Sequence, residues 1–537
     1  MTVQRYKFDS WQFMSSSQQS INCLNAGLKA LAEHDYRALH RIAMERIFED
    51  KQDPAPYYLL AELAANHGNT AKAEELFSKA ADLSPESARY LSAYAKILSL
   101  RSNTSLARDI NEKAACLPIT DAHVADTVGV IFSRTGLHEK AIPFFKLAIK
   151  LNPNPDNFYY NLGSSLQFLG EFEGAEQAYR ETIDRNPNHV KAYSSLVALK
   201  KQTPETNELQ ELFGLFETHQ DSAEQALHIG HAIAKTLEDM GQYEQSLTWL
   251  KRAKKEKKSE LSYDFESYLE IFKAAREGFE KIGSIAEPSQ QSPIFIVGLP
   301  RTGTTLVDRI LSSHPMVQSC GELNLMAGLI KNATKTSSNF VLDVRTLTES
   351  VNINLASIGH KYWTETSPLR RNAARMTDKM PLNFFYAGLI HKTFPNARII
   401  ALRRGAMDSC LSNFRQLFST TYSYYNYTYD LNDIARFYRE FDSLMAYWRS
   451  AIPTDRFTEV HYENIVFNQE TETRRLLDFC GLEWDERCMR FHENRSPVAT
   501  ASSVQVRQPL YSGSIGRWKK YGDTLNDLRS SLGSLAE

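Results

Sequence analysis

Residues 293–315 read PIFIVGLPRTGTTLVDRILSSHP, and this stretch decides the fold of the C-terminal half of the chain. It begins with an apolar, β-branched run, Ile294 to Val297, which predicts a short buried strand. A turn of the pattern Gly-x4-Gly-Thr-Thr follows, and apolar side chains then recur at helical spacing at Leu306 and Ile310. The order strand, loop and helix predicts an anion cradle, because loop amides and the positive end of the helix dipole would point into one concavity.

The loop has the spacing of a phosphate-binding loop but differs from it at one informative position. Gly298 and Gly303 are separated by four residues, as in that motif. NTPase loops carry Lys after the second glycine to reach the β- and γ-phosphates, whereas this chain has Thr304 there and Arg301 earlier in the loop. The cradle without this lysine indicates a phosphate-bearing donor other than ATP or GTP. For the loop taken alone, an ordinary glycine-containing turn is the alternative interpretation.

Length and composition narrow the class of protein. The chain has 537 residues, enough for roughly two to four domains with cores of their own. Lys and Arg number 62 against 64 Asp and Glu, so the net charge of −2 favours neither nucleic acid nor a membrane surface as a partner. The six cysteines have neither CxxC nor metal-ligand spacing. Because the sequence has no apolar run typical of a signal peptide or a membrane span, we expect a cytoplasmic protein.

The first half of the chain is predicted to be a helical repeat. Small residues recur every 34 positions in two phases, and prolines follow at nearly the same period. The positions are Gly68, Ser102, Gly136 and Gly170, then Ala73, Ala107, Ala141 and Ala175, then Pro85, Pro118, Pro153 and Pro187. Small residues let two helices approach closely, and Pro ends the second helix. We expect four units over residues 54–189, a degenerate unit over 20–53 and at least one more within 190–258.

This period resembles that of the tetratricopeptide repeat, whose helix pairs stack into a solenoid. The resemblance implies a concave face suited to an extended peptide or a partner helix. The alternative is that the repeats only shape or oligomerise the protein. The predicted domains are an all-α solenoid over residues 1–280, a linker over 281–292 and a separate domain over 293–537.

A second strand-turn-helix segment lies about 100 residues after the first and predicts a second phosphate site. Ala397 to Leu402 predicts a buried strand, Gly405 interrupts it, and a helix is expected to follow. Arg404 would stand at the carboxyl end of this strand, where ligands bind in open α/β sheets, and Ser412 about one turn into the helix. Their donors can converge on one phosphate, although a surface arginine with an ordinary helix serine is the alternative. The alternating patterns predict an α/β domain with a mostly parallel sheet and helices on both faces.

These two segments, in this order, resemble the sulfotransferase family, and most closely its tyrosylprotein-type members and bacterial proteins that join tetratricopeptide repeats to such a domain. The resemblance covers residues 292–525 and implies a P-loop-type fold. It also implies transfer of a sulfuryl group from 3′-phosphoadenosine-5′-phosphosulfate to a hydroxyl acceptor, without a metal. Arg404 and Ser412 would hold the 3′-phosphate of this donor. The residues that would hold its 5′-phosphosulfate end are Arg301, Thr302, Gly303, Thr304 and Thr305.

The resemblance also implies catalytic roles. Glu322 would be the base that takes the proton of the acceptor hydroxyl, although the tyrosylprotein-type members have two consecutive acids where this chain has one. Arg301 would neutralise charge on the sulfuryl oxygens, and Lys379 would stabilise the bridging oxygen as it leaves. A capping role for Glu322 and a solvated surface position for Lys379 are the alternatives.

Further contacts are implied near the C-terminus. Tyr462 would lie near the nucleotide, unless it is simply a core residue. Ser502 would assist at the sulfuryl group, and Arg507 and Lys519 would reach phosphate from a loop that closes over the donor. The aromatic stretch 421–429 would line the acceptor cleft or pack a loop.

Three functions remain open from the sequence. The first is a sulfotransferase acting on a peptide tyrosine or on a small hydroxyl compound, with the repeats recruiting the acceptor or a protein partner. The second is a P-loop kinase or NTPase, which Thr304 and the lack of an acidic magnesium ligand after an apolar strand disfavour. The third is a repeat scaffold with an inactive domain, which the joint presence of Arg301, Glu322, Lys379 and Arg404 disfavours.

Overall fold

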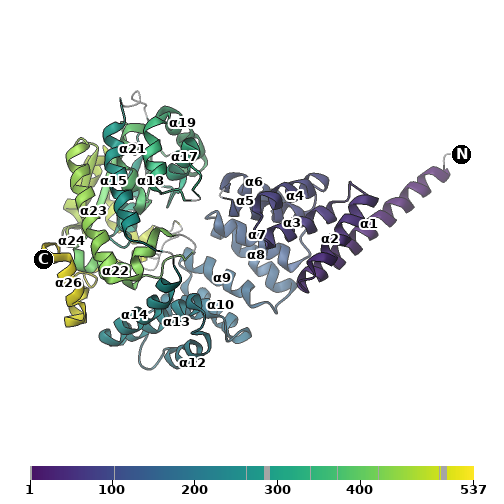
Figure 1. Cartoon of the computed structure of the whole chain (residues 1–537), viewed down its shortest axis with the longest axis horizontal. Helices are drawn as coiled ribbons and strands as arrows, with labels where there is room; N and C mark the ends of the chain where they lie inside the picture. Colours follow the sequence, from purple (N-terminus) through teal and green to yellow (C-terminus); the bar gives the residue numbers. More distant parts are fainter. Residues whose placement is uncertain are drawn as a thin grey trace. The chain divides into compact units, whose positions relative to one another are not determined.

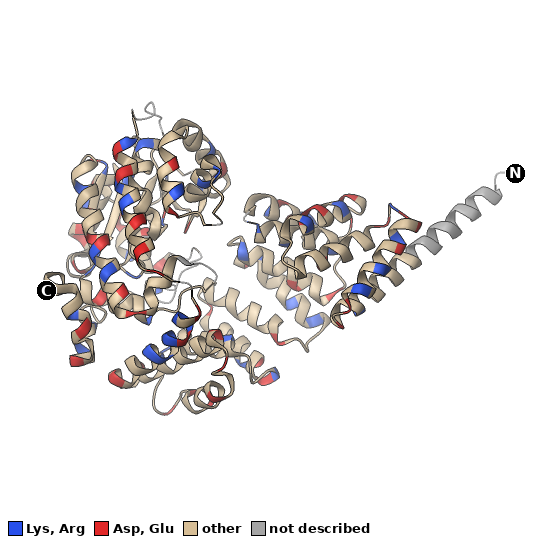
Figure 2. Cartoon of the chain, viewed as in Figure 1, with Lys and Arg blue, Asp and Glu red and all other residues tan. Residues whose placement is uncertain are grey.

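Figure 1 shows a computed structural model of the whole chain. The structure describes residues 3–101, 103–261, 263–283, 291–338, 340–371, 373–420, 423–494, 496 and 505–537. The chain divides into two compact units, Met1–Pro187 and Asn188–Glu537. In Figure 2, basic and acidic residues are interspersed along the helices of both units, in keeping with the small net charge of −2. Of the helices that the structure describes, none is both long enough and apolar enough to cross a bilayer.

The first unit is built of paired helices, as the repeat pattern predicts. Gly68, Gly136 and Gly170 follow the first helix of their pairs with φ of 74°, 78° and 85°, a left-handed conformation that explains why glycine recurs at this phase. The alanines of the second phase are fully buried where the helices touch. The helices are α1 (Val3–Ala32), α2 (Tyr36–Glu49), α3 (Pro54–Asn66), α4 (Thr70–Leu83), α5 (Ala88–Leu100), α6 (Thr104–Ala115), α7 (Ala122–Arg134), α8 (His138–Leu151), α9 (Asp156–Leu169) and α10 (Phe172–Arg185).

The second unit begins with helices that continue the repeat pattern. They are α11 (Val190–Leu199), α12 (Leu209–His219), α13 (Ala223–Asp239), α14 (Tyr243–Glu260) and α15 (Glu266–Lys281). Helices α13 and α14 form a further pair within residues 190–258, as expected, and they approach so closely that a Cβ on Gly230 would lie only 2.4 Å from that of Ala253. Most of the segment predicted as a linker, residues 284–290, lies outside the described residues, and the predicted domain limits stay a prediction.

A five-stranded sheet forms the centre of the second unit. Its order is β2-β3-β1-β4-β5, and every pair is parallel. The strands are β1 (Ile294–Gly298), β2 (Val317–Ser319), β3 (Arg375–Asp378), β4 (Arg398–Arg403) and β5 (Phe457–His461). The register places Ile296 beside Ile400 in the centre of the sheet. The predicted parallel sheet is therefore confirmed, and both of the strands predicted from sequence lie next to each other in it.

Helices cover both faces of this sheet. Alternate side chains of β1 enter two different apolar clusters, with Phe295 and Val297 in one and Ile294 and Ile296 in the other. This explains why the strand reads as a continuous apolar run rather than an alternating one. The α-helices that follow β1 in the chain are α16 (Thr304–Ser312), α17 (Leu325–Thr334), α18 (Val344–Glu349), α19 (Leu355–Glu365), α20 (Ser367–Arg370), α21 (Ala387–Thr393), α22 (Ala406–Arg415), α23 (Leu431–Ala451), α24 (Tyr462–Phe467), α25 (Gln469–Cys480) and α26 (Asn526–Leu532).

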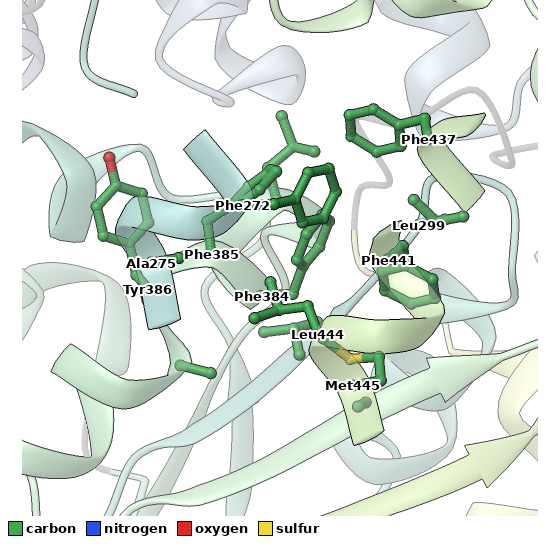
Figure 3. Packing of buried hydrophobic residues seen from close by; sticks show 14 of the residues in the cluster. Phe272, Ala275, Leu299, Phe384, Phe385, Tyr386, Phe437, Phe441, Leu444 and Met445 are labelled. Carbon is green, nitrogen blue, oxygen red and sulfur yellow. The ribbon is translucent and has the colours of Figure 1, made fainter. Parts of the chain in front are cut away.

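Helix α15, which precedes the predicted linker, belongs to the larger of the two clusters (Figure 3). Phe272 on α15 is fully buried. Its ring centre lies 4.7 Å from that of Phe385 and 5.1 Å from that of Phe437. The domain around the sheet therefore takes part of its core from a helix that lies before the predicted linker.

Candidate active site

The loop after β1 is shaped by its two glycines. A Cβ on Gly298 would lie 2.7 Å from the carbonyl oxygen of Leu402 on the neighbouring strand, so only glycine fits there. Gly303, with φ of 104°, starts α16, and Arg301 also has a positive φ of 66°. Thr304 and Thr305 are the first residues of α16. The predicted strand, loop and helix are confirmed, and the N-terminus of α16 follows the loop at the carboxyl end of β1.

Two side chains hold this loop from inside. The Thr302 hydroxyl is fully buried and donates to the carbonyl oxygen of Leu299 at 2.6 Å. The Asn413 amide, on α22, donates to the carbonyl oxygen of Pro300 at 2.9 Å. The Thr302 side chain therefore stabilises the loop from its buried side.

Gly303→Ala is expected to destabilise the protein by about 1–3 kcal/mol. The new Cβ would lie 2.8 Å from a ring carbon of Tyr462, on a backbone that L-residues avoid. Thermal unfolding of the variant and of the wild type would measure this loss of stability. Gly328→Ala is the matched control, since no atom lies within 4 Å of the Cβ position on that helical glycine. An unfolding temperature equal to that of the wild type would contradict the crowding of Gly303 by Tyr462.

Arg404 stands directly after β4, as predicted, and its guanidinium is held from several sides. It donates to the carbonyl oxygens of Arg301 at 3.0 Å and of Ser514 at 2.5 Å. The guanidinium lies 5.0 Å from the ring centre of Tyr462. Only 8% of Arg404 is exposed, and no hydrogen-bond partner for its buried Nε occurs among the residues the structure describes. This Nε is a donor that an anionic ligand can use.

A cavity of about 310 Å³ opens where the two strand-to-helix segments meet. It brings together most of the residues predicted from sequence: Arg301, Gly303, Thr304, Thr305, Glu322, Arg404, Ser412 and Tyr462. Thr302 and Lys379 are not part of its wall. Polar and aromatic residues that were not predicted as site residues also line the cavity, among them Asp408, Arg415, Gln505, Tyr511, Ser514 and Arg517.

Glu322 and Lys379 form an ion pair at the edge of this cavity. The two segments that carry them are joined by the Lys379 amide, which donates to the carbonyl oxygen of Gly321 at 2.9 Å. Lys379 is 1% exposed, so it is not the solvated surface lysine that was the alternative, while Glu322 is partly open to solvent. A carboxylate and an ammonium group thus stand together beside the anion cradle, which is a suitable pair for moving a proton and stabilising a leaving oxygen.

The charge of the cavity wall is predominantly positive. Arg301, Arg404, Arg415 and Arg517 line it, against the carboxylates of Glu322 and Asp408. Asp408 accepts from the amides of Gly516 at 2.5 Å and Trp518 at 3.1 Å. Loss of solvation, together with the nearby Arg415 and Arg404, lowers the pKa of Arg301 to about 10. A bound anion would relieve this crowding of cations.

Comparison with known proteins agrees with this geometry. Residues 293–486 match the sequence profile described as "Sulfotransferase family", and residues 53–119, 124–155 and 156–189 match tetratricopeptide-repeat profiles. The chain carries tetratricopeptide repeats and a sulfotransferase-family domain. The domain profile begins at Pro293, one residue before β1, so it covers both segments that form the cavity.

The relatives of the chain include proteins with and without a named activity. An "Uncharacterized protein" of Aquifex aeolicus is 28% identical over 365 residues, which cover 66% of this chain and 47% of the relative. "Protein-tyrosine sulfotransferase A" of Caenorhabditis elegans is 24% identical over 270 residues, 45% of this chain and 64% of the relative. The "Sulfotransferase Domain from the Curacin Biosynthetic Pathway" is 15% identical with a TM-score of 0.31, over 45% of this chain and 97% of that domain. The chain spans about half to two thirds of these two curated relatives.

The segment after residue 504, which lies beyond the profile match, also contacts the cavity. Arg301 donates to the Gln505 side chain at 3.0 Å, and the hydroxyls of Tyr462 and Ser514 are 2.7 Å apart. Ser502 lies outside the described residues, so its role stays a prediction. Arg507 and Lys519, which were expected to reach phosphate, are not among the residues that line the cavity. Arg517, from the same segment, does line the cavity.

The aromatic stretch 421–429 contributes both to the cavity and to the core. Tyr425 lines the cavity and stacks on Phe418, with ring centres 4.4 Å apart. Tyr427 is buried and stacks on Phe437 at 3.7 Å. One tyrosine thus agrees with the expected cleft lining and the other with loop packing, while Thr421 and Tyr422 fall outside the described residues.

The sequence reasoning missed Arg415 and Arg517 as cavity residues. Arg415 lies three residues after Ser412 on α22, and helical spacing places such residues on one face, so this signal was available. Arg517 had no comparable local signal. Over the part of the chain that the structure describes, no group of three or more His, Cys, Asp or Glu side chains could hold a metal ion. Independence from metal stays a prediction.

Proposed function

We propose that the chain transfers a sulfuryl group from 3′-phosphoadenosine-5′-phosphosulfate to a hydroxyl acceptor. The observation that carries this proposal is the meeting of three features at one cavity. These are the cradle before α16, the Arg404 and Ser412 pair, and the Glu322–Lys379 ion pair. The sulfotransferase-family domain supports the reaction type.

The two ends of the donor fit the two segments of the cavity. The 5′-phosphosulfate would lie on the α16 N-terminus, against Arg301, Thr304 and Thr305, which all line the cavity. The 3′-phosphate would accept from the free Nε of Arg404 and from Ser412. The absence of Lys after Gly303 agrees with this donor, since it has no γ-phosphate.

The reaction would be an in-line displacement at sulfur. The carboxylate of Glu322 takes the proton of the acceptor hydroxyl, and the acceptor oxygen forms a bond to sulfur. The bond between sulfur and the bridging 5′-phosphate oxygen breaks, and 3′,5′-adenosine bisphosphate leaves. Lys379 has three donors, so it can hold Glu322 and also stabilise the leaving oxygen. Arg301 neutralises charge on the sulfuryl oxygens.

The acceptor and the partners are also proposals. The stacked pair Phe418 and Tyr425 forms an apolar wall beside the positive part of the cavity. A peptide tyrosine or a small alcohol or phenol would suit such a wall. We propose that the repeats recruit the acceptor or a protein partner, and the expected cytoplasmic location stays a prediction.

Arg404→Ala is expected to weaken binding of 3′,5′-adenosine bisphosphate by about 2–3 kcal/mol, since a buried charged donor is lost. This corresponds to a dissociation constant roughly 30- to 150-fold higher. Titration calorimetry on folded protein measures it. Arg439→Ala, on the exposed side of α23, is the matched control and should bind like the wild type. Unchanged affinity in Arg404→Ala would remove this residue from the site.

Product formation tests the function directly. The purified chain would be incubated with the sulfuryl donor and separate acceptors: a tyrosine peptide, a phenol, an aliphatic alcohol and a sugar. Release of 3′,5′-adenosine bisphosphate that depends on one acceptor, together with a sulfated product, would support the proposal. Hydrolysis of Mg-ATP without any sulfuryl transfer would support the kinase or NTPase alternative and overturn the proposed sulfotransferase function.

A further inference from the structure

A carboxylate from the helical part of the second unit reaches the wall of the cavity. Glu238 lies near the end of α13, and it is 5% exposed. Its Oε2 accepts from Arg415 Nε at 2.7 Å and also from a terminal nitrogen of the same guanidinium. Its Oε1 forms an ion pair with Nε of Arg517 at 3.1 Å, a charge contact without hydrogen-bond geometry. One buried carboxylate therefore joins two arginines that both line the cavity.

The two arginines come from different segments of the second unit. Arg415 ends α22, the helix that carries Ser412, whereas Arg517 begins the 3₁₀-helix η6 (Arg517–Leu525). Both guanidinium groups are positive, so they would repel each other without a shared anion. Burial alone would lower the pKa of Arg415, but the carboxylate of Glu238 raises it above its ordinary value. The shared carboxylate thus holds the two guanidinium groups close together.

The same helix pair holds other segments of the cavity wall. The buried Lys254 on α14 donates to the carbonyl oxygen of Thr428 at 3.0 Å, in the 3₁₀-helix η3 (Ser423–Tyr429) that carries Tyr425. The rings of Tyr243 on α14 and Tyr521 on η6 lie 5.3 Å apart. Helices α13 and α14 therefore contact the segments that bring Arg415, Tyr425 and Arg517 to the cavity.

We propose that Glu238 is a positioning residue of the donor site, and that it orients Arg415 and Arg517 toward the anionic part of the donor. This inference rests on the proposed function. Arg415 uses Nε and one terminal N–H on a single carboxylate oxygen, so three of its five N–H donors are not taken by Glu238. Arg415 and Arg301 both line the cavity, and the positive charge of Arg415 contributes to the lowered pKa of Arg301. The helix pair thereby helps to determine donor affinity.

Two variants test this inference in the full-length chain. Glu238→Gln keeps the size of the side chain but removes its charge, and it is expected to raise the dissociation constant of 3′,5′-adenosine bisphosphate about tenfold, because the arginines lose their orientation. Arg415→Lys keeps the cavity charge but cannot donate through two nitrogens to one oxygen, and roughly a fivefold rise is expected. Glu244→Gln, an exposed acid on α14, is the matched control and should bind like the wild type.

The kinetic readout separates positioning from general damage. With an acceptor present, we expect KM for the donor to rise in both variants while kcat stays within about twofold of the wild type. Equal losses of kcat and affinity, with a lower unfolding temperature in both variants, would overturn the inference. A folded Glu238→Gln protein with wild-type affinity would overturn it too. If Glu238→Gln does not fold, wild-type affinity in Arg415→Lys would overturn it.

The same titrations separate this inference from the proposed function. A wild-type chain that fails to bind 3′,5′-adenosine bisphosphate overturns both. A wild-type chain that binds it, alongside variants with unchanged affinity, overturns only the role of Glu238.

Discussion

Glu322→Gln is expected to lower the turnover of sulfuryl transfer by about 100-fold or more, the usual contribution of a general base. The carboxylate of Glu322, at the edge of the cavity, can accept the proton of an acceptor hydroxyl, whereas the amide of Gln cannot. Donor binding should be unchanged to within about twofold, because Gln keeps an oxygen that can accept from Lys379. The measurements are initial rates with saturating donor and acceptor, and titration with 3′,5′-adenosine bisphosphate.

The control for this variant is Glu365→Gln, at the exposed end of α19, which should turn over like the wild type. Near-normal turnover in Glu322→Gln would remove Glu322 as the base. An equal loss of turnover and donor affinity would instead point to a structural role for the ion pair with Lys379.

Removal of residues 1–280 is expected to abolish folding of the sulfotransferase domain, whereas removal of residues 1–187 is expected to leave it folded. The longer deletion takes away Phe272, whose burial stabilises by about 1.5–3 kcal/mol. It also removes Glu238, and loss of one partner of a buried ion pair lowers the free energy of unfolding by about 3–5 kcal/mol. These losses together are comparable with the whole stability of a typical domain, about 5–15 kcal/mol.

Circular dichroism and thermal unfolding of the chains 281–537 and 188–537 measure this difference. The longer chain should unfold cooperatively and bind 3′,5′-adenosine bisphosphate like the full-length protein, because Asn188–Glu537 is a compact unit. If the chain of residues 281–537 unfolds at the same temperature as the longer chain, α13 and α15 do not stabilise the sulfotransferase domain.

The elements around the cavity were predictable because their signals are local. The apolar run before Gly298 and the run before Arg404 each specify a buried strand, and glycine marks each turn. In a parallel sheet the carboxyl ends of strands share one edge, so adjacency of these two strands brings the loops together. The 34-residue period likewise depends on residues that recur within each helix pair.

Contacts between distant segments were not predictable in the same way. The spacing of apolar residues shows that α15 buries one face, but not that Phe272 packs against Phe437. Glu238 and Arg415 are 177 residues apart, and nothing in the local sequence links them. The sequence also does not show which tyrosines of residues 423–429 enter the core and which line the cavity, because this depends on the backbone path. Pairing over such distances is decided by tertiary packing.

Titration calorimetry of the wild-type chain with 3′,5′-adenosine bisphosphate, in metal-free buffer and with ATP as the control, is the decisive test of the donor site. We predict micromolar or tighter binding of the bisphosphate and much weaker binding of ATP, since Arg404 and Ser412, the proposed 3′-phosphate donors, line the cavity and the loop carries Thr304 in place of the γ-phosphate lysine. Absence of bisphosphate binding, or tighter binding of ATP, would contradict the assignment of this cavity as a sulfuryl-donor site.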